Sequence, residues 1–113
     1  MKSKILHDTL KKNAENREVL RKQVLAETIE ILKLLSQETL FEKAYIFSSL
    51  SKPFDFRKNS DVDIAFQGLD KDKLYYATGF LSSHLERDVN VVNIEEVHFR
   101  DKIIREGIPW TKE

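Results

Sequence analysis

Two aspartates separated by a single residue stand in a segment that is otherwise apolar. Asp61 and Asp63 belong to the run DVDIAF, where Val62, Ile64 and Phe66 occupy the alternate positions. A period of two predicts a strand with both carboxylates on one face. Because an unpaired ionised carboxylate is costly to bury, we expect a positively charged group to meet them.

The spacing favours a divalent cation as that group. Carboxylates at positions i and i+2 of a strand have Cα atoms about 6.6 Å apart, so their oxygens can hold one or two cations between them. Hard oxygen ligands favour Mg²⁺ or Mn²⁺, and protein-bound magnesium is usually shared with substrate phosphates. We therefore interpret Asp61 and Asp63 as metal ligands and expect a phosphate site nearby.

The segment before the aspartates has the composition of such a site. The run SSLSK, residues 48–52, supplies small hydroxyl side chains and a lysine. Backbone N–H groups exposed in a turn of this kind can hold anionic oxygens. Arg57 and Lys58 add positive charge close to the aspartates.

The elements that must position these residues follow from the apolar periodicity. An amphipathic helix is predicted around residues 20–35, and strands are predicted at 43–47, 61–66 and 88–94. A helix capped by Asp70 and reaching Arg87 separates the last two strands. Asn93, with Glu96 three residues later, is predicted to cap a final helix that ends at Gly107.

The N-terminal residues extend the stripe of the first helix, but less regularly. Leu6 and Leu10 continue it, whereas Asn13, Arg17 and Arg21 interrupt it. Residues 1–14 are therefore predicted to form a helical extension that projects from a single domain spanning 1–113. Two interpretations stay open, a surface that meets a partner and a solvated, fraying terminus.

Composition narrows the class of protein. The chain has 113 residues, 19 basic and 19 acidic side chains, and no cysteine. One domain is expected, and nucleic acid is not expected as a partner because no basic surplus exists. Disulfides and thiolate metal sites are excluded. No apolar run approaches the roughly 20 residues of a membrane span, and we expect a cytoplasmic protein.

The motifs together resemble the polymerase-beta-like nucleotidyltransferases, especially their minimal single-domain (MNT) members. YIFSS, residues 45–49, is similar to a strand that ends in Phe-Gly-Ser, and NSDVDIAF is similar to the Ser-Asp-x-Asp strand. The tail FRDKIIREGIPW resembles the last helix of those proteins. The resemblance spans roughly residues 44–110. It implies an α/β (α+β) fold, with a small mixed sheet of three to four strands and helices packed on one side.

The resemblance also implies roles for individual residues. Asp61 and Asp63 would bind Mg²⁺ or Mn²⁺ and act in catalysis. The nucleoside triphosphate would be bound by residues of the serine turn and of the following loop, namely Ser48, Ser49, Lys52 and Ser60.

Two departures from the family pattern bear on activity. Ser48 stands where the family has glycine, and Asn90 stands where it has a third carboxylate. An amide can ligate a cation through its carbonyl oxygen but cannot act as a general base. Asp88, on the same strand face, is a candidate to substitute for the missing carboxylate.

The function implied is nucleotidyl transfer, slow or degenerate, from a nucleoside triphosphate. Minimal members of the family work beside a helical HEPN-domain protein as antitoxin and toxin, and some transfer AMP to it. We therefore expect a HEPN-type partner, with self-association as a further expectation. The alternative is a catalytically inactive interaction module of such a pair, with solvated aspartates. Phe54, Phe56 and Lys58 are interpreted either as a strip that binds a base or as loop packing.

Overall fold

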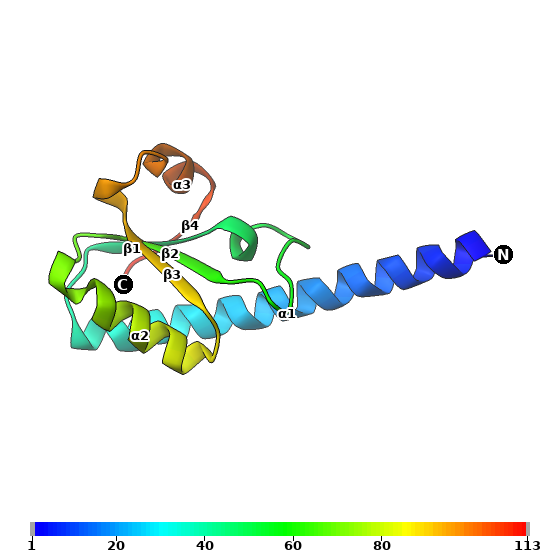
Figure 1. Cartoon of the computed structure of the whole chain (residues 1–113), viewed down its shortest axis with the longest axis horizontal. Coiled ribbons are helices and arrows are strands. Elements are labelled where there is room, and N and C mark those ends of the chain that lie inside the picture. Colours follow the sequence, from blue (N-terminus) through cyan, green and yellow to red (C-terminus); the bar gives the residue numbers. More distant parts are fainter. Residues whose placement is uncertain (1, 113) are drawn as a thin grey trace.

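The computed structural model describes residues 2–112, which form a mixed sheet with helices on both faces (Figure 1). The helices are α1 (Lys2–Glu38), α2 (Leu74–Leu85) and α3 (Arg100–Glu106). The strands are β1 (Lys43–Phe47), β2 (Val62–Gln67), β3 (Val89–Asn93) and β4 (Ile108–Trp110). Short 3-10 helices follow three of these elements: η1 (Ser48–Ser51), η2 (Lys71–Lys73) and η3 (Ile94–Glu96).

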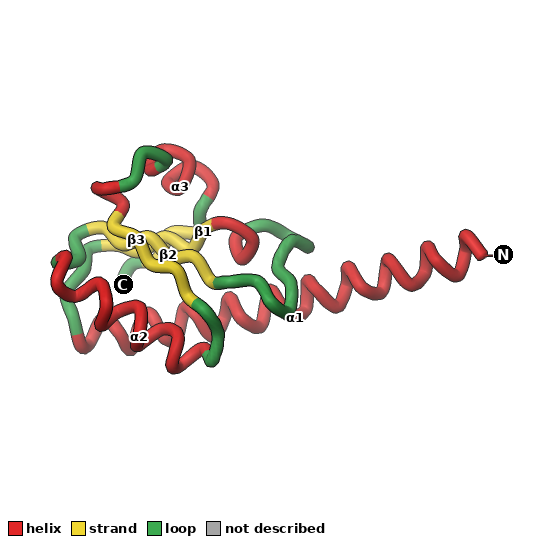
Figure 2. Tube along the Cα trace, in the orientation of Figure 1, coloured by secondary structure: helices red, strands yellow, loops and turns green. Residues whose placement is uncertain are grey.

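The sheet has the order β3-β2-β1-β4. Figure 2 shows the strands in yellow, with α3 on one side of them and α1 and α2 on the other. β1 pairs antiparallel with β2 and β4, whereas β2 and β3 are parallel. A parallel pair needs a crossover connection, and α2 supplies it. The predicted α/β class with a mixed sheet of three to four strands is confirmed, and β4, the C-terminal run IPW, is the fourth strand.

The strand alternation separates two apolar clusters. Ile46, Ile64 and Leu81 belong to the larger one, which lies between the sheet and the helices α1 and α2. Ile103 of α3 packs in a second cluster with Tyr45 and Ala65. The helices were predicted on one side, and α3 departs from that prediction because an apolar patch on the opposite face needs cover.

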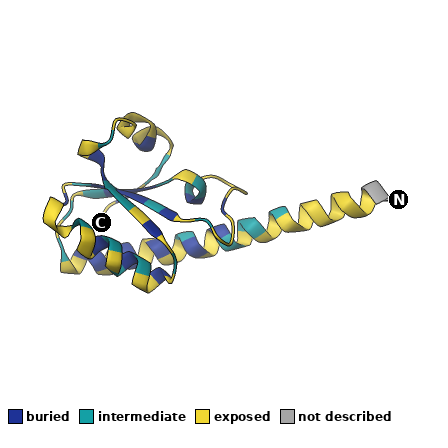
Figure 3. Ribbon diagram, viewed as in Figure 1, coloured by how far each residue is buried: buried dark blue, intermediate teal, exposed yellow. Residues whose placement is uncertain are grey.

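The helix α1 is one continuous element of 37 residues, about 55 Å long at 1.5 Å per residue. Its C-terminal half packs on the sheet, while its N-terminal half projects past the domain (Figures 1 and 3). Every side chain from residue 4 to residue 13 is exposed. Even so, none of the helices within residues 2–112 is both long and apolar enough to cross a membrane.

Both predicted side-chain caps are wrong. Asp70 precedes η2, and α2 begins only at Leu74, so its carboxylate caps nothing. Asn93 shares the inward face of β3 with Val89 and is only 5% exposed, which keeps its amide from capping η3. Its Oδ1 has no hydrogen-bond partner within the described residues.

Candidate functional site

The two aspartates lie where the central strands meet the serine turn. Asp63 is in β2, opposite Phe47 of β1 on one side and Asn90 of β3 on the other. It shares its face with Ala65, the face that α3 partly covers. Asp61 stands just before the strand and is exposed. The predicted alternation therefore places both carboxylates on the α3 face, beside the end of β1.

Asn90 brings the carboxylates together. Its Nδ2 donates hydrogen bonds to Asp63 Oδ1 at 3.0 Å and to Asp61 Oδ2 at 3.2 Å. Because one nitrogen reaches both groups, the two carboxylates must converge on a common point. The parallel pairing of β2 with β3, in which Asp63 and Asn90 are register partners, makes this possible.

The environment of Asp63 disfavours an isolated negative charge. Burial raises the pKa of Asp63 above its ordinary value, and the neighbouring charge of Asp61 raises it further. Hydrogen bonds with the side chains of Asn90 and Ser48 oppose this rise. A cation at this place would offset both the cost of burying the charge of Asp63 and its repulsion by Asp61.

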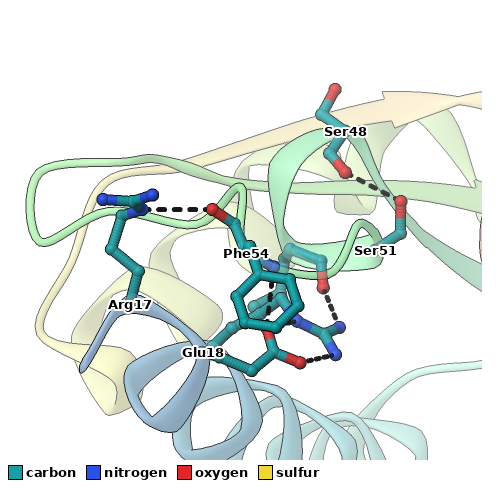
Figure 4. Close-up of polar contacts among 7 residues, drawn as sticks. Arg17, Glu18, Ser48, Ser51 and Phe54 are labelled. Atoms are coloured by element: carbon teal, nitrogen blue, oxygen red, sulfur yellow. Dashed lines mark hydrogen bonds and ion pairs between the residues drawn. The ribbon is translucent and has the colours of Figure 1, made fainter. Parts of the chain in front are cut away.

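Ser48 adopts the backbone conformation of a glycine. Its φ of 62° lies in the left-handed region, which strains a residue that carries a Cβ. The turn therefore has the shape that the family's Gly-Ser pattern implies, although the residue is serine. Ser51 Oγ donates to the carbonyl of Ser48 at 2.7 Å, which holds the turn (Figure 4).

A cluster of side chains on α1 holds the loop between η1 and β2, residues 52–61. Arg21 forms an ion pair with Glu18 at 2.7 Å and donates to the carbonyl of Leu50 at 3.1 Å. Glu18 in turn accepts a hydrogen bond from the backbone N–H of Phe54 at 2.8 Å. Arg17 donates a hydrogen bond to the carbonyl of Phe54 (Figure 4). The glycine-free loop is thus held through its backbone by side chains of α1.

Arg87, two residues after the end of α2, holds the other end of the loop. Its Nη1 donates to the carbonyls of Lys58 and Ser60, and its guanidinium lies over the ring of Phe56, 4.9 Å from the centroid. Phe56 is fully buried, whereas Phe54 is 52% exposed. Loop packing accounts for Phe56, so the predicted aromatic strip does not form as a continuous surface.

A pocket of about 200 Å³ opens beside the acidic pair. One wall comes from the end of β1 and from η1, and the other from α3 and its flanks. The side chains and backbone that line it are Phe47, Ser48, Ser51, Lys52, Phe99, Lys102, Ile103, Glu106 and Gly107.

The remaining predicted site residues lie at different distances from this centre. Lys52 lines the pocket, but Ser49 does not. Ser60 Oγ accepts from the backbone N–H of Arg57 at 2.9 Å, so it is engaged within the loop. Asp88 precedes β3 and its side chain is exposed, and it lines a shallow hollow together with Asp61.

Sequence reasoning missed Arg21, Arg87 and the contribution of α3. Arg21 was interpreted as an interruption of the apolar stripe, yet it is only 8% exposed, and its guanidinium donates to Glu18 and to the carbonyl of Leu50. A charged residue on a core-facing stripe signals a buried polar contact as readily as a helix that leaves the core. For Lys102 there was no signal, because only the fold brings α3 next to η1.

The donor set suits a hard cation with water ligands. Within residues 2–112 no three His, Cys, Asp or Glu side chains gather as a metal site. Asp61, Asp63 and the amide oxygen of Asn90 could supply two charged ligands and one neutral ligand, since an amide can present oxygen instead of N–H₂. Magnesium accepts few protein ligands and keeps several waters, so this set fits it.

Comparison with known proteins gives a consistent family. Residues 29–111 match the family described as polymerase beta, nucleotidyltransferase. No curated protein matches the chain. Among solved structures, a toxin-antitoxin complex with AMP-PNP is similar over 72% of this chain and 70% of that chain, with 24% identity and a TM-score of 0.60.

Two further solved structures carry nucleotidyltransferase names. One is named a minimal nucleotidyltransferase and is 20% identical, with a TM-score of 0.53 over 84% of this chain and 93% of that chain. The other, named a nucleotidyltransferase from Sulfolobus solfataricus, is 20% identical, with a TM-score of 0.50 over 88% of both chains. At these identities the likeness concerns the fold.

Proposed function

Because this chain belongs to the polymerase beta nucleotidyltransferase family, we propose that it binds a nucleoside triphosphate with a divalent cation and transfers the nucleotidyl group slowly to a protein acceptor. The observation that carries the proposal is the convergence of Asp61 and Asp63 on one point, where the Nδ2 of Asn90 now lies. A cation bound there would take over the position of that N–H₂ group.

The cation, Mg²⁺ or Mn²⁺, would neutralise charge on the phosphates and polarise the phosphorus that is attacked. Asp61 and Asp63 would hold it. Asn90 would turn its amide over, so that Oδ1 replaces the N–H₂ group that now faces the carboxylates. Ser48, Ser49 and Lys52, which follow β1 directly, would bind the phosphate chain.

In the proposed reaction an acceptor hydroxyl attacks the α-phosphorus. A bond forms between the acceptor oxygen and phosphorus, the bond to the β-phosphate oxygen breaks, and pyrophosphate leaves. The hydroxyl proton has to pass to a base. Asn90 cannot accept it, and Asp88 is exposed without a hydrogen bond to Asn90 or the carboxylates, so the proton would pass to solvent. Transfer is therefore expected to be slow.

The proposed acceptor is a helical HEPN-type protein that this chain would regulate as an antitoxin. Solved structures with this fold support the proposal. One is a toxin-antitoxin complex with AMP-PNP, and another is a variant of the MntA-HpeT toxin-antitoxin pair in which two aspartates spaced by two positions are replaced by glutamate. Asp61 and Asp63 have the same spacing.

The test is transfer of label from ATP. The full chain is incubated with Mg²⁺, the protein encoded next to its gene, and ATP labelled on the α- or the γ-phosphate. We expect the label to accumulate on the neighbour protein when the α-phosphate of ATP is labelled. With the Asp61→Asn, Asp63→Asn double variant, neither the α-label nor the γ-label should be transferred. Transfer of γ-label instead, or equal transfer by the double variant, would contradict the proposal.

One observation favours a second candidate function, an inactive interaction module. The Nδ2 of Asn90 already donates a hydrogen bond to each of the two carboxylates. If the chain is such a module, the double Asp→Asn variant will bind the neighbour protein with unchanged affinity, and magnesium with ATP will not alter that affinity.

A further inference from the structure

The pocket between η1 and α3 contains positive charge from two separate parts of the chain. Lys52 follows η1, and Lys102 comes from α3, fifty residues later in the sequence. Both side chains are exposed, and neither has an ion-pair partner within residues 2–112. Two lysines that line one small cavity without an ion-pair partner among the described residues favour an anion there.

The pocket adjoins the candidate metal site, although Asp61, Asp63 and Asn90 do not line it. Ser48 lines it, and the Ser48 side chain lowers the pKa of Asp63, so the two side chains are neighbours. Phe47, another lining residue, is the register partner of Asp63 across the sheet. An anion in the pocket would therefore lie next to a cation held by the carboxylates, as the phosphate chain of a bound nucleotide must.

The size and the lining of the pocket indicate which part of a nucleotide it can hold. At about 200 Å³ the pocket is smaller than sites that enclose a whole ligand, which measure about 300–1,000 Å³. The hydroxyls of Ser48 and Ser51 and the two lysines suit phosphate oxygens. Glu106 opposes an anion, although its carboxylate is engaged by Arg105 at 3.4 Å.

Resting on the proposed function, we infer that Lys102 of α3 binds the terminal phosphates of the triphosphate, opposite Lys52, and thereby selects triphosphates over monophosphates. The helix α3 thus closes the phosphate site as well as covering the sheet. Lys102 is a binding residue in this assignment, since it touches the leaving pyrophosphate and no atom of the acceptor.

The experiment is calorimetry of the full chain in Mg²⁺ with ATP, AMP and inorganic tripolyphosphate. Lys102→Met should weaken binding of ATP and tripolyphosphate about tenfold or more and leave AMP unchanged. Lys33→Met is the matched control, because Lys33 is an exposed lysine of α1 on the other side of the sheet; it should change nothing.

The outcomes separate this inference from the proposed function. Asp63→Asn could fail to bind ATP while Lys102→Met binds ATP with the affinity of wild type. In that case the assignment of Lys102 is wrong and the metal–nucleotide site stands. If wild type binds tripolyphosphate through Lys102 but binds no nucleotide, the pocket assignment stands and the proposed function fails. If wild type binds neither, both are overturned.

Discussion

Asn90 is the residue on which the proposed activity of this site depends. Its amide donates hydrogen bonds to both Asp61 and Asp63, and at the same time it lacks the charge and basicity of a third carboxylate. Asn90→Asp should raise nucleotidyl transfer about tenfold to a hundredfold, since a base and a metal ligand are gained. The label-transfer rate in Mg²⁺ measures this.

The same substitution should destabilise the metal-free chain. It removes two hydrogen bonds and brings three carboxylates together, for a cost of about 1 kcal/mol in the free energy of unfolding. Magnesium should restore that loss. Asp88→Asn is the control, because the Asp88 side chain is exposed and takes no part in this network; loss of transfer in that variant would show that Asp88 had replaced the third carboxylate.

At the level of single residues, the sequence predicted that the two carboxylates share a face, but it did not predict which side chain contacts them. The alternation around Asp61 and Asp63 predicted their shared face, because strand periodicity is a local property. That Asn90 reaches both of them depends on the pairing of β2 with β3. Side-chain geometry across two strands cannot be obtained from spacing along one.

Among the elements, α1 contributes most to holding the loop before the aspartates. The hydrogen bonds from Arg21 and from the Phe54 backbone lower the pKa of Glu18 to about 2 from its ordinary 4.5. Because the folded pKa is depressed, this carboxylate stabilises the fold above about pH 4.5 and loses that effect as the pH falls toward 2. Glu18→Gln should therefore lower stability at pH 7.

The measurement is urea unfolding of both proteins from pH 7 to pH 2.5. The difference between wild type and Glu18→Gln should narrow steadily below about pH 4.5. Glu15→Gln is the control, since Glu15 is exposed on the same helix. A difference that stays constant with pH would mean that Glu18 acts by packing and not by its charge.

The end of α2 carries strain that can be removed. Glu86 terminates the helix in the left-handed conformation, with φ of 52° and ψ of 44°. Glu86→Gly should stabilise the chain by about 0.5–1 kcal/mol, because glycine avoids the Cβ clash at the cost of some unfolded-state entropy. Calorimetric Tm should rise by a few degrees, whereas Glu86→Ala should give no gain.

Elements with a regular spacing of apolar residues could be predicted from the sequence, whereas the polar contacts at their ends could not. The strands β1, β2 and β3 and the helix α2 follow from their apolar spacing, whereas β4 was not predicted as a strand. Asp70 was predicted as a cap from its residue type, and Asn93 from its type and its spacing to Glu96. However, η2 separates Asp70 from α2, and the side chain of Asn93 is buried. A cap depends on where the backbone turns, which neighbouring elements decide.

On the scale of the whole molecule, the N-terminal half of α1 stands apart from the domain. The family match begins at residue 29, and the side chains of residues 4–13 contact too little of the chain to be buried. Removing residues 2–13 should leave the free energy of unfolding within about 0.5 kcal/mol of wild type. Urea unfolding with coincident fluorescence and circular dichroism tests this.

A longer deletion, of residues 2–21, should behave differently. It also removes Glu18 and Arg21 and leaves the carbonyl of Leu50 without its donor, so stability should fall by about 1–3 kcal/mol. Equal stability of the two deletions would show that the α1 cluster does not hold the loop.

In the proposed function, Asp61 and Asp63 hold a cation on which nucleotide binding depends. The decisive measurement is calorimetric titration of ATP into wild type and into Asp63→Asn, each in Mg²⁺ and again with the cation chelated. Wild type should bind ATP in Mg²⁺ only, and Asp63→Asn should not bind it in either condition. Equal affinity of the two proteins for ATP in Mg²⁺, or binding by wild type that survives chelation, would contradict it.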